Sequence, residues 1–239
     1  MTGKHDKDEF LISKQNILYY DEIADSYDRI LDQDSLNNII REKVARRFIE
    51  YVKPGCVLDF GGGTGRDLKW LTENHYKIFF CEPSAGMKEK AIQHNQKVLH
   101  NNNIVFLEKA QTEFTHWHEE LPFTEKVDAI LSNFAVINCI PHIELLFKNL
   151  ALIIKPGGAL VALILDNKAK GLISRLRGAL RSFILKTPLT VDIKYKEHLQ
   201  TVYVYTTKQI KKASKANFDF SNRESLPGFG FILIHLIRK

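Results

Sequence analysis

The sequence is poor in cysteine, and its cysteines are not paired along the chain. Cys56, Cys81 and Cys139 share no C-x-x-C spacing, so the pattern gives no indication of a zinc site or a redox pair. Two of them fall in apolar segments that we predict to be strands. We therefore expect free, buried thiols and a reducing, cytoplasmic compartment.

Long apolar runs are also absent. The longest, Ala159–Leu165 and Phe229–Ile237, are far shorter than the roughly 18 residues that a membrane-spanning helix needs. The first residues, Met1–Asp8, are polar and charged and contain no apolar core of a signal peptide. We expect a soluble protein that is not secreted by that route.

Charge of one sign is only mildly in excess. A net charge of +6 is low for a nucleic-acid-binding protein, so the position of the charges matters more than their sum. With 239 residues, 44% of them hydrophobic, the chain is long enough for one domain with a large core and a cap.

The most informative stretch is a glycine-rich loop after an apolar run. Cys56–Phe60 carries Asp59 and is followed by Gly61, Gly62, Gly63 and Gly65. Apolar residues at helical spacing come next, so the order predicts a strand, a tight loop and a helix. Glycines permit positive φ and a close approach to a ligand, and a helix amino terminus favours polar or negative groups. A nucleotide-like cofactor is the expected occupant.

The spacing of the glycines separates the candidate cofactors. A dinucleotide fingerprint needs a third glycine where this chain has Arg66, and no Gly-Lys-Ser/Thr ending of a P-loop is present. The remaining pattern, Asp-x-Gly-x-Gly-x-Gly, resembles the first motif of the class I S-adenosylmethionine-dependent methyltransferases. The resemblance implies that Asp59 supports the loop and the amino group of S-adenosylmethionine. A glycine-rich hairpin loop is the alternative.

A carboxylate follows the next predicted strand, Tyr76–Cys81. Glu82 lies 17 residues after Gly65, close to the offset of about 20 at which an acid binds ribose hydroxyls in doubly wound folds. Pro83 and the serine after it then begin a helix. That helix carries Met87, which contacts the adenine or serves as plain packing.

The third predicted strand, Ile104–Leu107, ends differently from the family. Where the family has an acid and a small residue against the adenine, this chain has Lys109, Ala110 and Gln111. We expect Gln111 or a backbone group to replace the carboxylate. Ala110 is the one hint of the alternative that this is a non-catalytic regulatory or assembly protein that binds S-adenosylmethionine.

The fourth predicted strand, Val127–Ser132, ends in Asn133 and Phe134, which resemble the family's residues beside the transferred methyl group. Neither the Asn/Asp-Pro-Pro-aromatic motif of amino-group methyltransferases nor a Pro-Cys or Thr-Cys nucleophile is present, which disfavours nucleic acid as the acceptor. The Lys-Pro-Gly-Gly turn at 155–158 also resembles the family. We predict an α/β fold with a doubly wound, seven-stranded, mostly parallel sheet, a last strand that is antiparallel, and a helical lid.

Two amphipathic helices precede the sheet in our prediction. The first is capped by Asp21, and the second follows Asp34-Ser35 and presents one apolar face from Leu36 to Ile49. The segment around the first helix resembles the part of small-molecule methyltransferases, including the quinone and lipid groups, that folds over the cofactor. This implies that Tyr20 lies at the cofactor and Tyr27 in the substrate pocket, unless both are ordinary core aromatics.

The segment from 166 to 206 departs from the family. A predicted helix over 170–186 has one apolar face and one basic face that carries Arg175, Arg177 and Arg181. It serves as a lid, as a docking surface for an acyl carrier protein or an anionic membrane, or as a cap with a solvated face. Alternation after residue 200 places Tyr203 and Tyr205 on one side of a strand. We expect Asn138 and these two tyrosines in the substrate pocket.

The sequence thus predicts a helical cap over 1–55, a cofactor-binding core over 56–165, a lid over 166–206 and a completing segment over 207–239. We expect methyl transfer to oxygen or carbon of a small or carrier-bound, aromatic or lipid-like acceptor. His142 and Tyr20 are candidates for the base by position, and His116 and His118 do not predict a metal site. An RNA or protein methyltransferase that uses the basic helix is the alternative.

Overall fold

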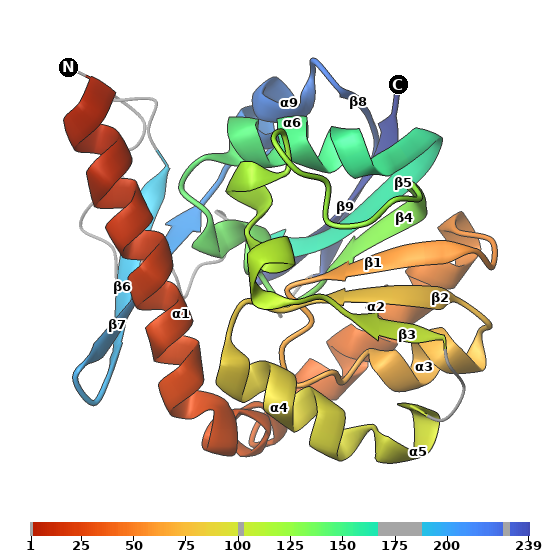
Figure 1. Ribbon diagram of the computed structural model, residues 1–239, viewed down its shortest axis with the longest axis horizontal. Helices are drawn as coiled ribbons and strands as arrows, with labels where there is room; N and C mark the ends of the chain where they lie inside the picture. The colour runs from red at the N-terminus through yellow and green to blue at the C-terminus, as the bar shows by residue number, and fades with distance from the viewer. Residues whose placement is uncertain (1, 100–102, 167–187, 227–229) are drawn as a thin grey trace.

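The computed structural model describes residues 2–99, 103–166, 188–226 and 230–239 (Figure 1). Its centre is a seven-stranded sheet in the order β3-β2-β1-β4-β5-β9-β8. Its strands are β1 (Cys56–Phe60), β2 (Lys77–Cys81), β3 (Ile104–Phe106), β4 (Val127–Ser132), β5 (Ile154–Leu165), β8 (Phe218–Leu226) and β9 (Phe231–Arg238). β1 to β5 pair in parallel, and β9 is antiparallel to both β5 and β8. The predicted mostly parallel sheet with an antiparallel last strand is confirmed.

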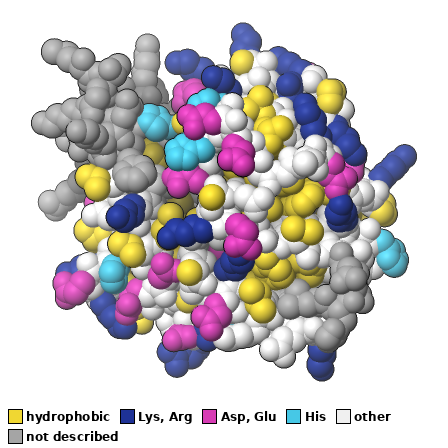
Figure 2. All heavy atoms as spheres, viewed as in Figure 1, with side chains coloured by type: hydrophobic (Ala, Val, Ile, Leu, Met, Phe, Trp, Pro, Cys, Tyr) yellow, Lys and Arg dark blue, Asp and Glu magenta, His cyan; other side chains and the backbone are white. Residues whose placement is uncertain are grey.

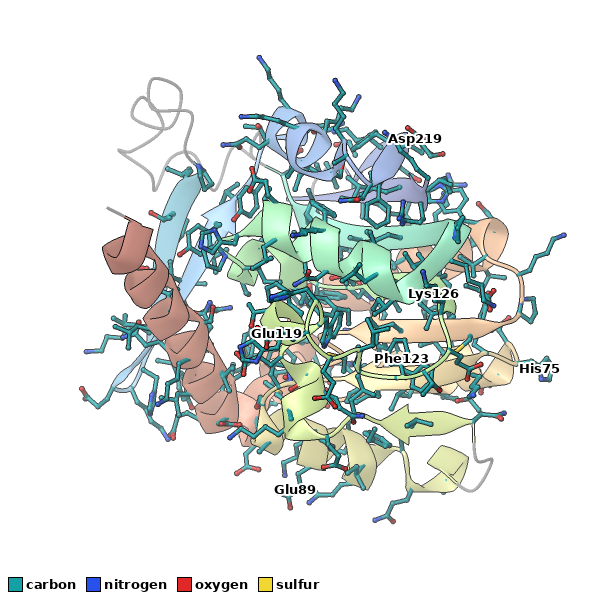
Figure 3. All side chains as sticks on the ribbon, turned by 45° about the horizontal axis from the view of Figure 1, so that its top comes forward. His75, Glu89, Glu119, Phe123, Lys126 and Asp219 are labelled. Carbon is teal, nitrogen blue, oxygen red and sulfur yellow. The ribbon has the colours of Figure 1, made fainter. Side chains whose placement is uncertain are left out.

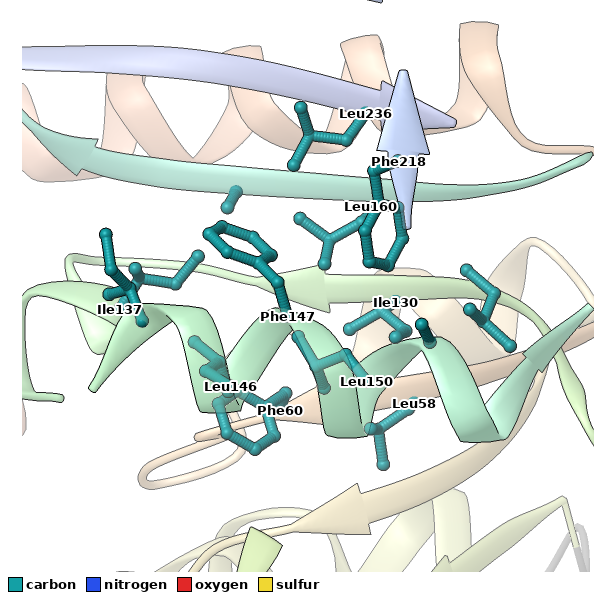
Figure 4. Packing of buried hydrophobic residues seen from close by; sticks show 14 of the residues in the cluster. Leu58, Phe60, Ile130, Ile137, Leu146, Phe147, Leu150, Leu160, Phe218 and Leu236 are labelled. Carbon is teal, nitrogen blue, oxygen red and sulfur yellow. The ribbon is translucent and has the colours of Figure 1, made fainter. Parts of the chain in front are cut away.

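Helices cover both faces of this sheet. They are α1 (Thr2–Asp32), α2 (Leu36–Tyr51), α3 (Leu68–Glu73), α4 (Ala85–His94), α5 (Gln96–Leu99), α6 (Ile143–Ile153) and α9 (Thr207–Ser214), with single 3-10 turns η1 (Lys109–Thr112), η2 (Phe114–His116) and η3 (Val136–Cys139). Alternation along β1 sends Leu58 into the core under α6 and Val57 into the core under α2 and α3. Figure 4 shows Leu146, Phe147 and Leu150 of α6 packed on the strands, in the core that contains Leu58.

The apolar face predicted for α2 is only partly buried. Ile40, Val44 and Phe48 are in the core, but Leu36, Ile39 and Ile49 are exposed by 41%, 51% and 41%. The buried residues are four apart, which gives a narrow stripe along one side of the helix. The prediction of one apolar face through all six residues was therefore too broad.

Helix α1 begins far before Asp21, so the prediction of Asp21 as its cap is wrong. The Asp21 carboxylate instead accepts hydrogen bonds from the Ser84 hydroxyl (2.6 Å) and the Gly86 amide (3.0 Å) at the start of α4. Asp25, Asp28 and Asp32 follow at helical spacing on the same side of α1. Figure 1 shows α1 lying across the end of the sheet beside α4.

A hairpin of β6 (Leu189–Tyr195) and β7 (His198–Val204) forms a separate two-stranded sheet. It packs against α1, where the ring of Tyr195 lies 6.5 Å from that of Tyr19. The alternation after residue 200 correctly predicted the second strand. The first strand of the hairpin was not anticipated from the sequence.

Within the described ranges, no helix combines the length and the apolar character that crossing a bilayer requires.

Candidate functional site

A cavity of about 480 Å³ opens at the carboxyl ends of β1, β2 and β4. Its size is within the roughly 300–1,000 Å³ of ligand pockets. α1 forms one wall, the glycine loop and the ends of β2 and β4 form the floor, and η2, η3 and the start of α6 form the far end. Of the residues predicted to bind cofactor, those that line it are Tyr20, Gly61, Gly62, Gly63, Glu82, Pro83, Met87, Asn133 and Phe134.

The glycine loop is held in place by the end of β2. The amides of Gly61 and Gly62 both donate to the Cys81 carbonyl, at 2.8 and 3.2 Å. A Cβ on Gly62 would meet the Phe80 ring at 2.1 Å, so this position packs too closely for any side chain. Gly63 has φ of 59°, and a Cβ there would meet nothing within 4 Å. The loop therefore presents open space to the cavity at Gly63.

Gly65 lies behind the loop and not in the cavity lining. Its φ is 73°, and a Cβ there would meet Ala91 of α4 at 2.9 Å. The Asn95 side chain donates to its carbonyl at 3.1 Å. The fourth glycine of the motif thus allows close packing of the loop on α4.

Glu82 is buried at the cavity wall and faces the loop. Its carboxylate accepts the Gly63 amide at 2.8 Å and the Ser84 amide at 2.9 Å. Burial raises the pKa of Glu82 to about 7, and the two amide hydrogen bonds oppose that rise. An ionised carboxylate here gains from additional hydroxyl donors in the cavity, as ribose hydroxyls would supply.

Asp59 is 1% exposed, and its Oδ2 has no hydrogen-bond partner in the described part of the chain. Burial raises the pKa of Asp59 well above its ordinary value, the nearby Asp67 adds to the rise, and Arg41 opposes it. Asp59 does not itself line the cavity but immediately precedes the glycine loop. A buried carboxylate oxygen without a partner fits a ligand that brings a positively charged amino group.

Arg41 is a cavity residue that the sequence did not reveal. Its guanidinium donates to Asp67 at 2.6 Å and lies 4.4 Å above the ring of Phe134. Asn133 donates to the same Asp67 oxygen at 3.0 Å. Arg41 follows Ile40 and lies beside the buried stripe of α2, and a cation at that place in the pattern was the available signal.

The far end of the cavity is mainly apolar. It is lined by Ser13, Asn16, Ile17 and Tyr20 of α1 and by residues of η2, of η3 and the turn after it, and of α6, namely Phe114, Thr115, His116, Val136, Cys139, Ile140, Pro141, His142 and Leu145. Both candidates for the base, Tyr20 and His142, are here. Burial raises the pKa of Tyr20 well above its ordinary value, so its hydroxyl keeps its proton at neutral pH. Tyr27 also lines the cavity, and burial raises its pKa to about 12.

The segment between β3 and β4 covers this part of the sheet. Phe123, labelled in Figure 3, stacks on Phe79 at 4.1 Å between ring centroids. Gln111 accepts from the Glu108 amide at 2.8 Å and donates to the Pro122 carbonyl at 2.9 Å. Ala110 and Gln111 are not cavity residues, whereas Lys109 and Thr112 are. The expectation that Gln111 reaches the adenine has no support, because both polar atoms of its side chain are hydrogen-bonded to the backbone of Glu108 and Pro122.

The predicted substrate residues Asn138, Tyr203 and Tyr205 also lie outside the cavity lining. Asn138 donates to the Tyr203 carbonyl at 2.7 Å and accepts the Leu165 amide at 3.0 Å. The Tyr205 hydroxyl donates to the carbonyls of Ile140 and Pro141, at 2.5 and 3.0 Å. These three residues fix the chain that forms the cavity wall.

The basic helix predicted over 170–186, with Arg175, Arg177 and Arg181, lies outside the described residues.

Figure 2 shows histidine and acidic side chains close together on the face turned to the viewer. In the described ranges, however, no group of three or more His, Cys, Asp or Glu side chains could hold a metal ion.

Comparison with known proteins gives one family. A family model described as a methyltransferase domain matches residues 32–222. None of the curated protein sequences that were compared matches this one.

Solved structures share the fold at low sequence identity. The DhpI-SAM-HEP complex has a TM-score of 0.68 and 15% identity, over 94% of this chain and 97% of that chain. The 1,6-didemethyltoxoflavin-N1-methyltransferase of Burkholderia thailandensis, with bound 1,6-didemethyltoxoflavin and S-adenosylhomocysteine, has 0.64 and 12%, over 93% and 88%. An S-adenosylmethionine-dependent methyltransferase of Clostridium acetobutylicum has 0.61 and 14%, over 92% and 98%.

Proposed function

The chain belongs to the methyltransferase domain family, and from this premise we propose that it methylates oxygen or carbon of a small or carrier-bound, aromatic or lipid-like acceptor. S-adenosylmethionine is the cofactor. The observation that carries the choice of acceptor is the mainly apolar far end of the cavity, where Ile17, Phe114, Ile140 and Leu145 surround polar groups such as Tyr20 and His142. Such a lining favours an apolar or aromatic body with a small number of polar contacts.

The residues around the glycine loop suit the cofactor. Glu82 would accept its ribose hydroxyls, and the open space at Gly63 would take its methionine part. The guanidinium of Arg41, which lines the cavity, would complement the cofactor's carboxylate. The unpartnered oxygen of Asp59, directly before the glycine loop, would become ionised beside the cofactor's amino group. The sulfonium of the bound cofactor makes its methyl group electrophilic.

The chain's own contribution is then alignment and exclusion of water. α1 closes one side of the cavity, and the apolar far end holds the acceptor against it. A hydroxyl or enolisable carbon must also lose a proton. His142 at the start of α6 lines the far end and is our candidate for that base.

Two measurements test this proposal. Calorimetry with S-adenosylhomocysteine should show binding at one site, and absence of binding would refute an S-adenosylmethionine-dependent enzyme. Methyl-labelled S-adenosylmethionine should then label an aromatic or lipid-like acceptor from a panel or an extract. Label that appears only in RNA or protein would overturn the proposed acceptor class, and binding without any turnover would favour the non-catalytic alternative.

A further inference from the structure

Three side chains from distant parts of the chain meet at the far end of the cavity. Tyr20 comes from α1, Cys139 from the end of η3 and Gln200 from β7. The Gln200 amide nitrogen donates to the Tyr20 hydroxyl at 2.6 Å and to the Cys139 sulfur at 3.4 Å. Tyr20 and Cys139 line the cavity, while Gln200 is 6% exposed and lies behind them.

The protons of this cluster can be assigned from its donors and acceptors. Both N–H groups of Gln200 point at its two neighbours, so the Tyr20 oxygen acts there as an acceptor. The Cys139 thiol donates to the Ala135 carbonyl at 3.7 Å. The phenolic proton of Tyr20 then has only the Cys139 sulfur, a weak acceptor at 3.6 Å, among the partners that the described residues provide.

Asn16 of α1, which also lines the cavity, holds the cluster in place. The Asn16 amide donates to the carbonyls of Cys139 (3.1 Å) and Thr201 (3.0 Å), and its oxygen accepts the Thr201 amide at 2.8 Å. α1, η3 and β7 are thereby joined around one point. Burial raises the pKa of both Tyr20 and Cys139, so both remain neutral, and neither is a base or a thiolate nucleophile at neutral pH.

We propose that the phenolic hydroxyl of Tyr20 donates a hydrogen bond to an oxygen of the methyl acceptor, and that Gln200 is the positioning residue that turns this O–H toward the cavity. The inference rests on the proposed function and narrows its acceptor class. The acceptor carries a carbonyl or similar oxygen with free lone pairs, placed beside its apolar body. An otherwise similar hydrocarbon leaves the Tyr20 proton without a good partner.

The test compares two fragments of nearly the same shape on protein saturated with S-adenosylhomocysteine. Acetophenone has a carbonyl oxygen where 2-phenylpropene has a methylene group. Ligand-observed NMR should show that the wild-type protein binds acetophenone about fivefold more tightly, as one neutral hydrogen bond supplies. Tyr20→Phe should reduce this ratio to about one.

Gln200→Glu separates positioning from simple packing, because the shape of the side chain is kept. A carboxylate at this place accepts the Tyr20 proton and withdraws it from the cavity, so the preference for acetophenone should also be lost. Tyr19→Phe is the matched control, since the Tyr19 ring packs on Tyr20 and Tyr195 but is not part of the cavity lining, and the substitution keeps that ring. It should keep the preference.

Calorimetry with S-adenosylhomocysteine distinguishes the possible failures. If the wild-type protein does not bind it, the proposed function fails together with this inference. If the wild-type protein binds it but shows no preference for acetophenone, including the case in which neither fragment binds, only the role of Tyr20 is wrong. A preference that survives in Gln200→Glu refutes the role of Gln200. A preference that survives in Tyr20→Phe refutes the role of Tyr20, and this test stands even if Gln200→Glu does not fold.

Discussion

Gly63 and Gly157 are two glycines with positive φ that lie in different parts of the chain. Their φ angles are 59° and 79°, and a Cβ at either meets nothing within 4 Å. Any other residue at these positions costs about 1–2 kcal/mol of backbone strain. They differ in that Gly63 lines the cavity, whereas Gly157 lies in β5 between Ile154 and Ala159, where the pairing with β4 shifts register.

We expect Gly63→Arg to abolish binding of S-adenosylhomocysteine in calorimetry, because the side chain fills the open space of the loop. Both variants should lower the melting temperature to a similar extent because of the backbone strain, but Gly157→Arg should leave binding unchanged. Loss of binding in both variants would mean that strain, and not occupation of the cavity, is responsible.

Glu82 makes cofactor binding depend on pH. Its pKa is about 7 in the cofactor-free protein because the group is buried, and hydroxyl donors favour its ionised form. Binding should therefore release a proton near pH 7. Below that pH the affinity for S-adenosylhomocysteine should fall by up to about tenfold per pH unit. Calorimetry in buffers of different ionisation enthalpy counts the proton, and Glu82→Gln should bind weakly with no such dependence.

Helix α1 is attached to the cofactor-binding loops by its acidic side. Asp21 binds the start of α4, Asp25 pairs with Lys90 at 2.7 Å, and Asp28 accepts the Thr64 hydroxyl at 2.6 Å. Asp32 pairs with Arg66 at 2.5 Å. Arg66, which stands where the dinucleotide motif requires a glycine, thus serves to hold α1 over the loop.

Asp21→Ala should destabilise the protein by about 1–2 kcal/mol, since two hydrogen bonds at a helix amino terminus are lost. Amide exchange should become faster in α1 and at the start of α4. Asp25→Ala is the control, because Asp25 is 89% exposed and its ion pair with Lys90 lies at the surface. Equal effects of the two variants would contradict the attachment through Asp21.

The elements that the sequence predicted best are those whose signal is local. The glycine loop, Glu82 after β2 and the turn at 155–158 are each recognisable from neighbouring residues. The roles of Arg41 and Gln200 depend on contacts with segments far away in the chain. A cation beside the buried stripe of α2 was the one local sign of Arg41, and no local pattern indicated Gln200. Asp21 shows the limit clearly: its sequence context suggested a cap of its own helix, and it binds another helix instead.

At the scale of the whole molecule, Asn16 joins α1 to the end of η3 and to β7, which lie 123 and 185 residues further along the chain. Asn16→Ala leaves the carbonyls of Cys139 and Thr201 and the Thr201 amide without this partner. We expect a loss of about 2 kcal/mol in the free energy of unfolding, measured with urea. Gln15→Ala, at the exposed neighbouring position, should change it by less than about 0.5 kcal/mol.

The place of β9 in the sheet has a consequence for how the protein folds. β9 lies between β5 and β8, and in the described part of the chain β8 pairs with no other strand. β8 can therefore join the sheet only together with β9, as a hairpin. Until residues 231–238 arrive, the apolar edge of β5 stays open to pairing with other chains. Refolding should thus be most prone to aggregation just before this late, long-range step.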